Sequence, residues 1–245
     1  MHRCRGINKQ LSVISCYSPP TSPTLVHPAP STPHFLLMTQ TLDFIKFSPN
    51  TQQAPTALII TLHGWGANAQ DVEALVPYVN LPDYEFFLPN APYPYPYSPV
   101  GRAWYDLRDG NMYEGLAESR QLLIDWLLSL ESNTGVPLSR TILTGFSQGG
   151  AMTLDVGLTL PLAGLVVMSG YLHPNIGNLH QNSFPPTLIM HGRQDQVVPL
   201  QAAIKATEVA QSLGVAVEYH EFDMGHEINL QMLEVLRNFV IKTIS

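Results

Sequence analysis

The sequence predicts an α/β protein in which helices cover both faces of a mostly parallel sheet. From Thr41 to the end of the 245-residue chain, short apolar segments alternate with amphipathic ones. This alternation is typical of strands joined by helical crossovers, which place helices on the faces of a parallel sheet. Several apolar segments are also continuous, as expected of strands that are buried on both faces.

The first half of the pattern predicts three strands and two helices. In TLDFIKF, the apolar Leu42, Phe44 and Ile45 indicate a strand, and TALIITLHG is an uninterrupted apolar run. YEFFLPN indicates a third strand, DVEALVPYVN suits a helix, and the segment from Tyr113 has leucines at helical spacing. The expected strands cover residues 41–47, 56–64 and 84–90, and the expected helices cover 71–80 and 113–132.

The second half predicts four more strands and three more helices. Four segments are apolar and short, as strands are: RTILTG, LAGLVVMSG, PTLIMHG and VAVEYHEF. Between them lie helix-compatible segments, one of which ends at Gly214, a residue that commonly terminates helices. The expected strands cover residues 140–145, 162–170, 186–192 and 215–222, and the expected helices cover 147–160, 199–214 and 228–244.

Residues 1–37 differ from the rest of the chain. Six prolines lie between Pro19 and Pro33, and proline removes the backbone donor that helices and sheet ladders need. We therefore expect a disordered, Pro-rich extension, with Met38 as a candidate start, followed by a single domain over residues 38–245. An alternative is a lipoprotein signal that ends at Cys16, although the apolar patch before it is short.

Composition excludes several classes of function. The formal net charge is −7 with only 12 Lys and Arg residues, which argues against nucleic acid as a partner. Cys4 and Cys16 are the only cysteines, so the rest of the chain has no disulfide framework or cysteine zinc site. His226-Glu227 begins a zinc motif, but residue 230 is Leu. No apolar run is long enough to span a membrane. We expect neither a metal nor a cofactor.

The segment TGFSQGG places Ser147 between two glycines. It follows a predicted strand and opens a predicted helix, which is the context of a nucleophile elbow. Such a turn is sharp, so the neighbours of the serine must be small for strand and helix to pack closely. The alternative is a Gly-rich turn with a capping serine. We expect Ser147 to be a nucleophile.

A serine nucleophile needs a base and an orienting acid, which follow it in the order Asp or Glu, then His, in hydrolases with this elbow. His226 comes after the last predicted strand, where open α/β sheets place ligand sites. Asp195 follows the preceding strand and is the expected acid. Asp223 is the alternative, and Asp155 is disfavoured because it lies on the helix after Ser147.

Stabilising an oxyanion requires two backbone N–H groups, one after the nucleophile and one from an early loop. Gln148 is expected to supply the first, and Trp65, between Gly64 and Gly66, is the candidate for the second. The same loop also matches the dinucleotide pattern G-x-G-x-x-A, which expects an acidic residue at the end of the next strand. That strand ends in Pro89-Asn90 instead, so dinucleotide binding is disfavoured.

The segments LHGWGAN, GFSQGG, HGRQDQVVP and GHEI together resemble the carboxylesterase/phospholipase family of α/β-hydrolases, which includes acyl-protein thioesterases and small carboxylesterases. The resemblance covers about residues 42–243. It implies the α/β-hydrolase fold for the domain, Ser147, Asp195 and His226 as the triad, and Trp65 and Gln148 as the oxyanion hole. It also implies that Trp104 and Tyr105 line the substrate side.

Two features depart from the family pattern. Trp65 stands where the family often has a smaller aliphatic residue, which implies an altered acyl pocket. The Tyr-Pro repeat at Tyr93, Tyr95 and Tyr97 looks particular to this chain.

The expected function is that of a serine carboxylesterase that hydrolyses small to medium acyl esters through an acyl-enzyme on Ser147. An acyl-protein thioesterase, a lysophospholipase and a non-catalytic ligand-binding relative are the alternatives. The expected partner is a small-molecule ester, without nucleic acid or stable membrane insertion. We expect a cytoplasmic protein, and a homodimer is left open.

Overall fold

The computed structural model describes residues 14–15, 41–48, 54–174 and 183–245. Most of the predicted extension over residues 1–37 lies outside these ranges, as do Cys4, Cys16 and Met38. The predicted disorder, the domain boundary and the lipidation signal therefore stay predictions.

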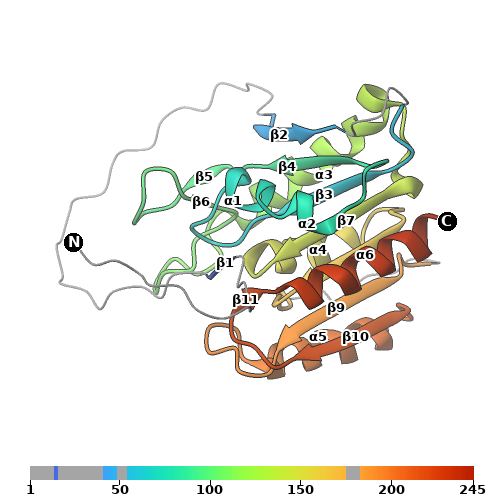
Figure 1. Cartoon of the computed structure of the whole chain (residues 1–245). Helices are drawn as coiled ribbons and strands as arrows, with labels where there is room; N and C mark the ends of the chain where they lie inside the picture. The colour runs from blue at the N-terminus through green and yellow to red at the C-terminus, as the bar shows by residue number, and fades with distance from the viewer. Residues whose placement is uncertain (1–13, 16–40, 49–53, 175–182) are drawn as a thin grey trace, which may run out of the picture.

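A seven-stranded sheet forms the centre of the molecule (Figure 1). Its strand order is β10-β9-β8-β7-β3-β4-β2, and all neighbours are parallel except β2, which is antiparallel to β4. The strands are β2 (Phe44–Phe47), β3 (Leu58–Leu62), β4 (Glu85–Pro89), β7 (Thr141–Phe146), β8 (Gly164–Met168), β9 (Thr187–Gly192) and β10 (Val217–Phe222). All seven predicted strands are present, and the predicted α/β-hydrolase sheet is confirmed.

Helices cover both faces of this sheet. Helices α1 (Ala69–Glu73), α2 (Val76–Val79) and α6 (Leu230–Ile244) pack on one face, and α3 (Leu116–Thr134), α4 (Gln148–Gly157) and α5 (Leu200–Ser212) on the other. A hydrophobic core lies on each face of the sheet, and alternate residues of each strand point into one core or the other. Ile60 packs on the side of α3, and Ile59 packs on the side of α1. This two-sided burial explains why the strands read as continuous apolar runs.

The helix expected at residues 71–80 is two short helices instead. Helix α1 begins earlier because Asn68 caps it: the Asn68 side chain accepts from the Asp71 N–H at 3.2 Å, and the Asp71 carboxylate accepts from the Asn68 N–H at 3.0 Å. The continuous helix is broken because Pro77 has no N–H to donate to an earlier carbonyl. Asn80 ends α2 in a left-handed conformation.

Two small antiparallel pairs lie outside the main sheet. Strand β5 (Tyr93–Pro94) pairs with β6 (Arg102–Ala103), and β1 (Ile14–Ser15) pairs with β11 (Glu227–Ile228). The second pair joins two residues of the predicted extension to the loop after β10. Ile14 and Ser15 precede the first proline of the Pro-rich stretch, so their backbone N–H groups remain able to pair.

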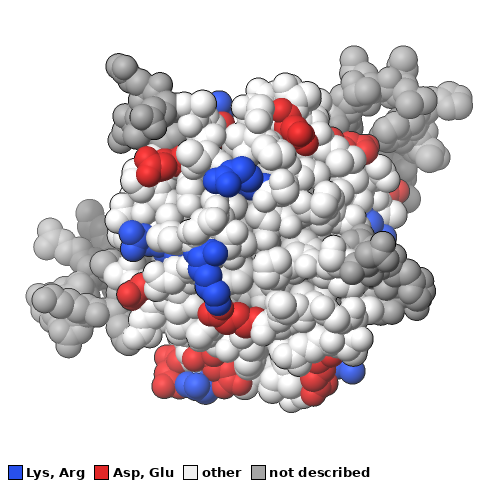
Figure 2. All heavy atoms as spheres, turned by 90° about the vertical axis from the view of Figure 1, so that its right-hand side faces the viewer, with Lys and Arg blue, Asp and Glu red and all other residues white. Residues whose placement is uncertain are grey.

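The loops at the carboxyl ends of the parallel strands gather at one edge of the sheet. In Figure 1, β5, β6, β1 and β11 all lie on this left-hand side. Open α/β sheets bind ligands at this edge. Figure 2 views the molecule from the opposite side, where Lys and Arg side chains are interspersed with Asp and Glu. Among the described residues on that face, the basic side chains form no continuous surface of the kind that binds nucleic acid.

Gly149 illustrates how tightly the serine-bearing helix packs on the sheet. A Cβ at this position would overlap the Leu62 carbonyl and lie 2.6 Å from the His63 carbonyl oxygen. We expect Gly149→Ala to lower the free energy of unfolding by about 3 kcal/mol, because backbone cannot move aside as a flexible side chain can. Denaturant unfolding measures this. Gly225→Ala is the matched control, since its Cβ would meet only the Gln194 oxygen, at 3.9 Å. Equal losses in the two variants would contradict the prediction.

Candidate active site

Ser147 occupies a strained turn between β7 and α4. Its φ of 55° and ψ of −117° lie outside the regions that non-glycine residues ordinarily adopt. Its N–H donates to the Met168 carbonyl at 2.9 Å, which holds the turn against β8. The side chain is buried but projects beyond the carboxyl end of β7. This geometry is that of the predicted nucleophile elbow.

The two flanking glycines permit this turn. A Cβ on Gly145 would overlap the Gly149 carbonyl and lie 2.7 Å from Thr153 Oγ1, and Gly149 presses against β3 as described above. The expectation that the neighbours of Ser147 must be small is therefore confirmed.

The predicted triad residues come together at the carboxyl edge of the sheet. His226 Nε2 lies 3.0 Å from Ser147 Oγ, and His226 Nδ1 lies 2.7 Å from Asp195 Oδ2. Asp195 follows β9 and His226 follows β10, as the chain order predicted. The Phe146 ring packs beside the imidazole with centroids 4.8 Å apart. This chain of hydrogen bonds has the form that nucleophilic catalysis by serine requires.

The surroundings of Asp195 keep its carboxylate ionised. Burial alone would raise its pKa, but the hydrogen bond from His226 and the N–H groups of Val198 and Val197 hold the pKa below its ordinary value. These N–H groups donate to Oδ1 at 2.8 Å and 2.9 Å. An ionised Asp195 only accepts, so His226 carries its proton on Nδ1. His226 Nε2 is then free to accept the Ser147 hydroxyl proton.

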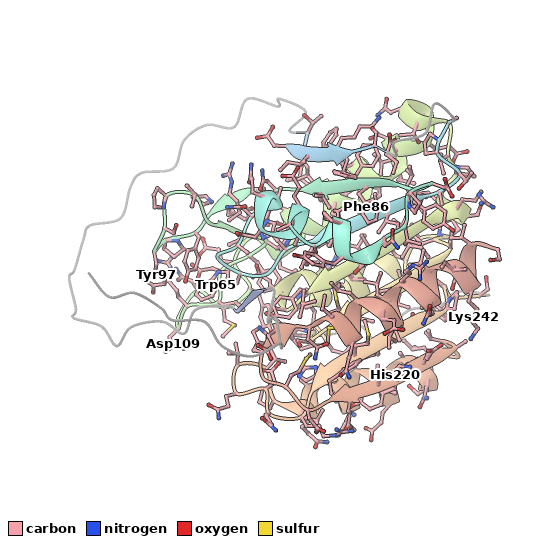
Figure 3. The ribbon with its side chains drawn as sticks, in the orientation of Figure 1. Trp65, Phe86, Tyr97, Asp109, His220 and Lys242 are labelled. Atoms are coloured by element: carbon pink, nitrogen blue, oxygen red, sulfur yellow. The ribbon has the colours of Figure 1, made fainter. Side chains whose placement is uncertain are left out.

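The alternative acids have other partners. Asp223 is exposed and its Oδ1 lies 2.6 Å from Arg193 Nη1. Asp155 is buried and pairs with Arg120 and His173. A histidine six residues before His226 is also engaged elsewhere. His220 pairs with Glu218, and Figure 3 shows it near Lys242 and far from Trp65.

The loop after β3 and the start of α4 present the two predicted oxyanion donors, Trp65 and Gln148. Within the described ranges, the backbone N–H groups of Trp65 and Gln148 donate to no acceptor. His63 fixes the start of this loop: its Nδ1 bonds the Gly64 carbonyl at 2.8 Å, and its Nε2 accepts from the Ala91 N–H at 3.0 Å. Burial lowers the pKa of His63 to about 4, so it is neutral at physiological pH. Two free N–H groups beside the serine can receive a developing negative charge.

The Gln148 side chain has a role that sequence reasoning missed. Its Oε1 accepts from the Trp104 N–H at 2.9 Å, and its Nε2 donates to the Tyr105 carbonyl at 2.8 Å. The residue that offers an oxyanion donor thus also anchors the neighbouring loop. The two partners are more than forty residues apart in sequence. The only signal in the sequence was the polar side chain of Gln148 within the serine motif.

Trp104, which was expected on the substrate side, lies in the core of the described structure. Its side chain is fully buried, and its indole N–H donates to the His63 carbonyl at 3.0 Å. It is a core residue that supports the oxyanion loop. Tyr105 is also buried, and it borders a cavity beside Trp65.

A buried polar chain behind Tyr105 was also not predicted. Asp155 accepts from Arg120 Nε at 2.8 Å and from His173 Nδ1 at 3.0 Å. His173 Nε2 lies 2.7 Å from the Tyr105 hydroxyl, which lies 2.6 Å from the Tyr171 hydroxyl. The chain ties the serine-bearing helix α4 to α3 and to the loops after β6 and β8. No local motif marks it, because its members lie far apart in sequence.

We expect the Asp155 pair to stabilise the protein in a pH-dependent way. Burial would raise the pKa of Asp155, but hydrogen bonds from His173 and Arg120 lower it overall. A lowered folded-state pKa means that the stabilisation is present above the unfolded pKa of about 3.9 and is lost as the pH falls through the folded value. Asp155→Asn should therefore lower the free energy of unfolding at neutral pH by about 2 kcal/mol, and the difference should shrink below about pH 4.

Denaturant unfolding at several pH values checks this prediction. Asp125→Asn is the control, since Asp125 is exposed and its side chain bonds only Gln121 among the described residues. A difference between Asp155→Asn and the native protein that stays constant from neutral to acidic pH would contradict it.

A cavity of about 440 Å³ lies beside Trp65. Ser147, Asp195 and His226 do not line it, but Trp65 and Tyr105 do. The Trp65 ring also packs against Tyr95 and Tyr97, with centroids 4.9 Å and 6.4 Å away, and Figure 3 shows Trp65 and Tyr97 together at the loop end of the molecule. The cavity is lined by Trp65, Tyr93, Pro94, Pro96, Ala103, Tyr105, Asp106, Arg108, Glu114, Gly115 and Glu118.

No helix in the described part of the chain is long and apolar enough to cross a membrane. Over the same residues, no group of three or more His, Cys, Asp or Glu side chains is arranged to hold a metal ion.

Known proteins share this fold and part of this sequence. The phospholipase/carboxylesterase family matches residues 47–244. Acyl-protein thioesterase 1 of Neurospora crassa is 29% identical over 211 residues, which are 76% of this chain and 86% of that protein. The mouse lysophospholipase-like protein 1 is 28% identical over 208 residues, with the same two shares. The crystal structure of esterase PE8 superposes with a TM-score of 0.77 at 29% identity, covering 83% of this chain and all of that one.

The sheet order and the serine turn at its carboxyl edge define an α/β-hydrolase. The chain belongs to the phospholipase/carboxylesterase family of these serine hydrolases. The resemblance noted in the sequence is thereby confirmed.

Proposed function

We propose that this protein is a carboxylesterase that forms an acyl-enzyme on Ser147. The observation that carries the proposal is the continuous hydrogen-bond chain from Ser147 Oγ through His226 to Asp195. A serine hydroxyl is a weak nucleophile unless a base takes its proton and an acid orients that base. The three groups have this arrangement at the edge of the sheet where α/β proteins bind substrates.

The reaction begins when His226 Nε2 takes the Ser147 proton as the hydroxyl oxygen attacks the ester carbonyl. Asp195 holds the imidazole in the required tautomer and stabilises its charged form. The N–H groups of Trp65 and Gln148 stabilise the oxyanion, each contributing about 3 kcal/mol in sites of this kind. His226 then donates the proton to the leaving alcohol. Water repeats the sequence on the acyl-enzyme and releases the acid.

The proposed substrates are esters of small to medium acyl groups. The cavity beside Trp65 supports this choice, because about 440 Å³ is near the lower end of small-molecule sites. Thioesters of acylated proteins and lysophospholipids are the second candidates, supported by the relatives named acyl-protein thioesterase and lysophospholipase-like protein. All three undergo the same acyl transfer. A non-catalytic binding protein would not need the complete hydrogen-bond chain.

A panel of p-nitrophenyl esters with graded acyl length tests the proposal. We expect kcat/KM to peak at a short or medium acyl chain, and intact mass spectrometry to detect an acyl adduct on Ser147. An acyl thioester and a lysophospholipid of matched chain length compare the alternatives directly. Absence of hydrolysis and of adduct across the whole panel would overturn the proposal and favour a binding protein.

We also propose that the protein is cytoplasmic. If it forms an oligomer, the proposed oligomeric state is a homodimer. Cell fractionation and light scattering of the purified chain test these two points.

A further inference from the structure

The cavity beside Trp65 and the histidine lie on opposite sides of Ser147. Ser147 follows β7, which pairs with β8 on one side and β3 on the other. His226 follows β10, on the β8 side of the sheet order. Trp65 follows β3, and Tyr93 and Ala103 belong to the β5–β6 pair that follows β4. The cavity is thus reached from the β3 side.

This separation distinguishes the two halves of an ester. The leaving alcohol receives its proton from the histidine, so it must lie on the His226 side. The acyl group stays bound to Ser147 and extends the other way. Trp65 continues directly from Gly64, whose added Cβ would lie 3.4 Å from the Ser147 Cβ. An acyl chain that leaves Ser147 past Trp65 would extend toward the cavity, which Trp65 lines.

The charged residues of the cavity leave a negative excess. Arg108 donates to Asp106 through Nε at 2.9 Å and Nη2 at 2.6 Å, so these two charges offset each other. Glu114 and Glu118 have no Lys or Arg within ion-pair distance in the described ranges. Both lie close enough to Tyr93 to add to the effect of burial, which raises the pKa of its hydroxyl.

The aromatic side chains of the cavity also favour a cation over an anion. Trp65 and Tyr93 contribute aromatic side chains to the wall, which the fully buried Tyr105 also borders. The faces of aromatic rings attract cations and repel anions, because the ring quadrupole is negative above and below the plane. Together, the aromatic rings and the carboxylates of the cavity disfavour a carboxylate on the bound acyl chain. They favour an ammonium group there.

We propose that this cavity receives the acyl group, and that Glu114 and Glu118 select acyl groups with a cationic far end over those with an anionic one. The proposal rests on the esterase function proposed above. It assigns a chemical class to the acyl half of the substrate: medium-length chains that end in an amine or a quaternary ammonium group, with uncharged chains intermediate.

Three p-nitrophenyl esters of equal chain length test the selection, with a trimethylammonium, a methyl or a carboxylate group at the far end. Each rate is divided by the alkaline hydrolysis rate of the same ester, which removes differences in intrinsic reactivity. We expect kcat/KM to be about three- to tenfold higher for the cationic than for the anionic ester at low salt, the size that two exposed charges support. Added salt should reduce the ratio.

Charge-neutral variants locate the effect. Glu114→Gln and Glu118→Gln should each reduce the ratio, and the double variant should bring it close to one. Glu131→Gln is the matched control, since Glu131 is exposed on the same helix as Glu118 but about 20 Å away by helical rise. It removes one negative charge and should leave the ratio unchanged. Thermal unfolding confirms that the variants are folded.

The outcomes separate this inference from the proposed function. Hydrolysis of the uncharged ester with a ratio near one, or with a ratio that the double variant retains, would overturn the inference and leave the esterase intact. An equal change in Glu131→Gln would attribute the effect to net charge and would also overturn it. Failure to hydrolyse any of the esters would overturn the esterase function itself, and the inference with it.

Discussion

Replacing Ser147 by alanine is expected to abolish ester hydrolysis while the protein remains folded. The hydroxyl is the group that attacks the carbonyl, and nothing else in the hydrogen-bond chain can form the acyl-enzyme. Removal of the nucleophile from a serine hydrolase costs on the order of 10⁶-fold in kcat. Burst kinetics and mass spectrometry with a p-nitrophenyl ester should show neither turnover nor adduct.

Ser169→Ala is a suitable control for this experiment. Ser169 is buried at the end of the neighbouring strand β8 and has a similar left-handed φ of 48°. Its hydroxyl has no hydrogen-bond partner in the described part of the chain. Both substitutions therefore remove one buried hydroxyl at a strained position, and Ser169→Ala should keep its activity. Near-normal turnover by folded Ser147→Ala would refute the proposed mechanism.

Asp195→Asn is expected to reduce kcat by about 10⁴, the cost of selecting the wrong histidine tautomer. The asparagine keeps the shape of the side chain, but its amide group can donate to His226 Nδ1. The imidazole would then carry its proton on Nε2, facing Ser147, where it cannot act as a base. The measurement is kcat with the preferred ester at saturating concentration.

Asp223→Asn is the comparison that makes this prediction specific to one acid. Asp223 lies only three residues before His226, but its ion pair with Arg193 is exposed. Such an exposed pair is screened by solvent, contributes little to stability and should have little effect on turnover. A crippled Asp223→Asn beside an active Asp195→Asn would reassign the acid.

The local features of this protein could be predicted from sequence. Strands and helices follow from hydrophobic periodicity, which depends on neighbours along the chain. The turn at Ser147 could be predicted because its glycines must be adjacent in sequence to allow that backbone path. Chain order then indicated Asp195 as the acid and His226 as the base, because parallel strands bring their carboxyl ends to one edge of the sheet.

Contacts between distant segments were decided by the tertiary structure alone. Trp104 and Tyr105 are adjacent, yet one supports the oxyanion loop from the core and the other borders the cavity. The pairing of Ile14 with Ile228 joins opposite ends of the chain. Asp155 meets His173, and Gln148 meets Tyr105, through packing of helix α4 on the sheet. Sequence periodicity specifies which face of an element is buried, but the side chains that meet there depend on strand order and loop paths.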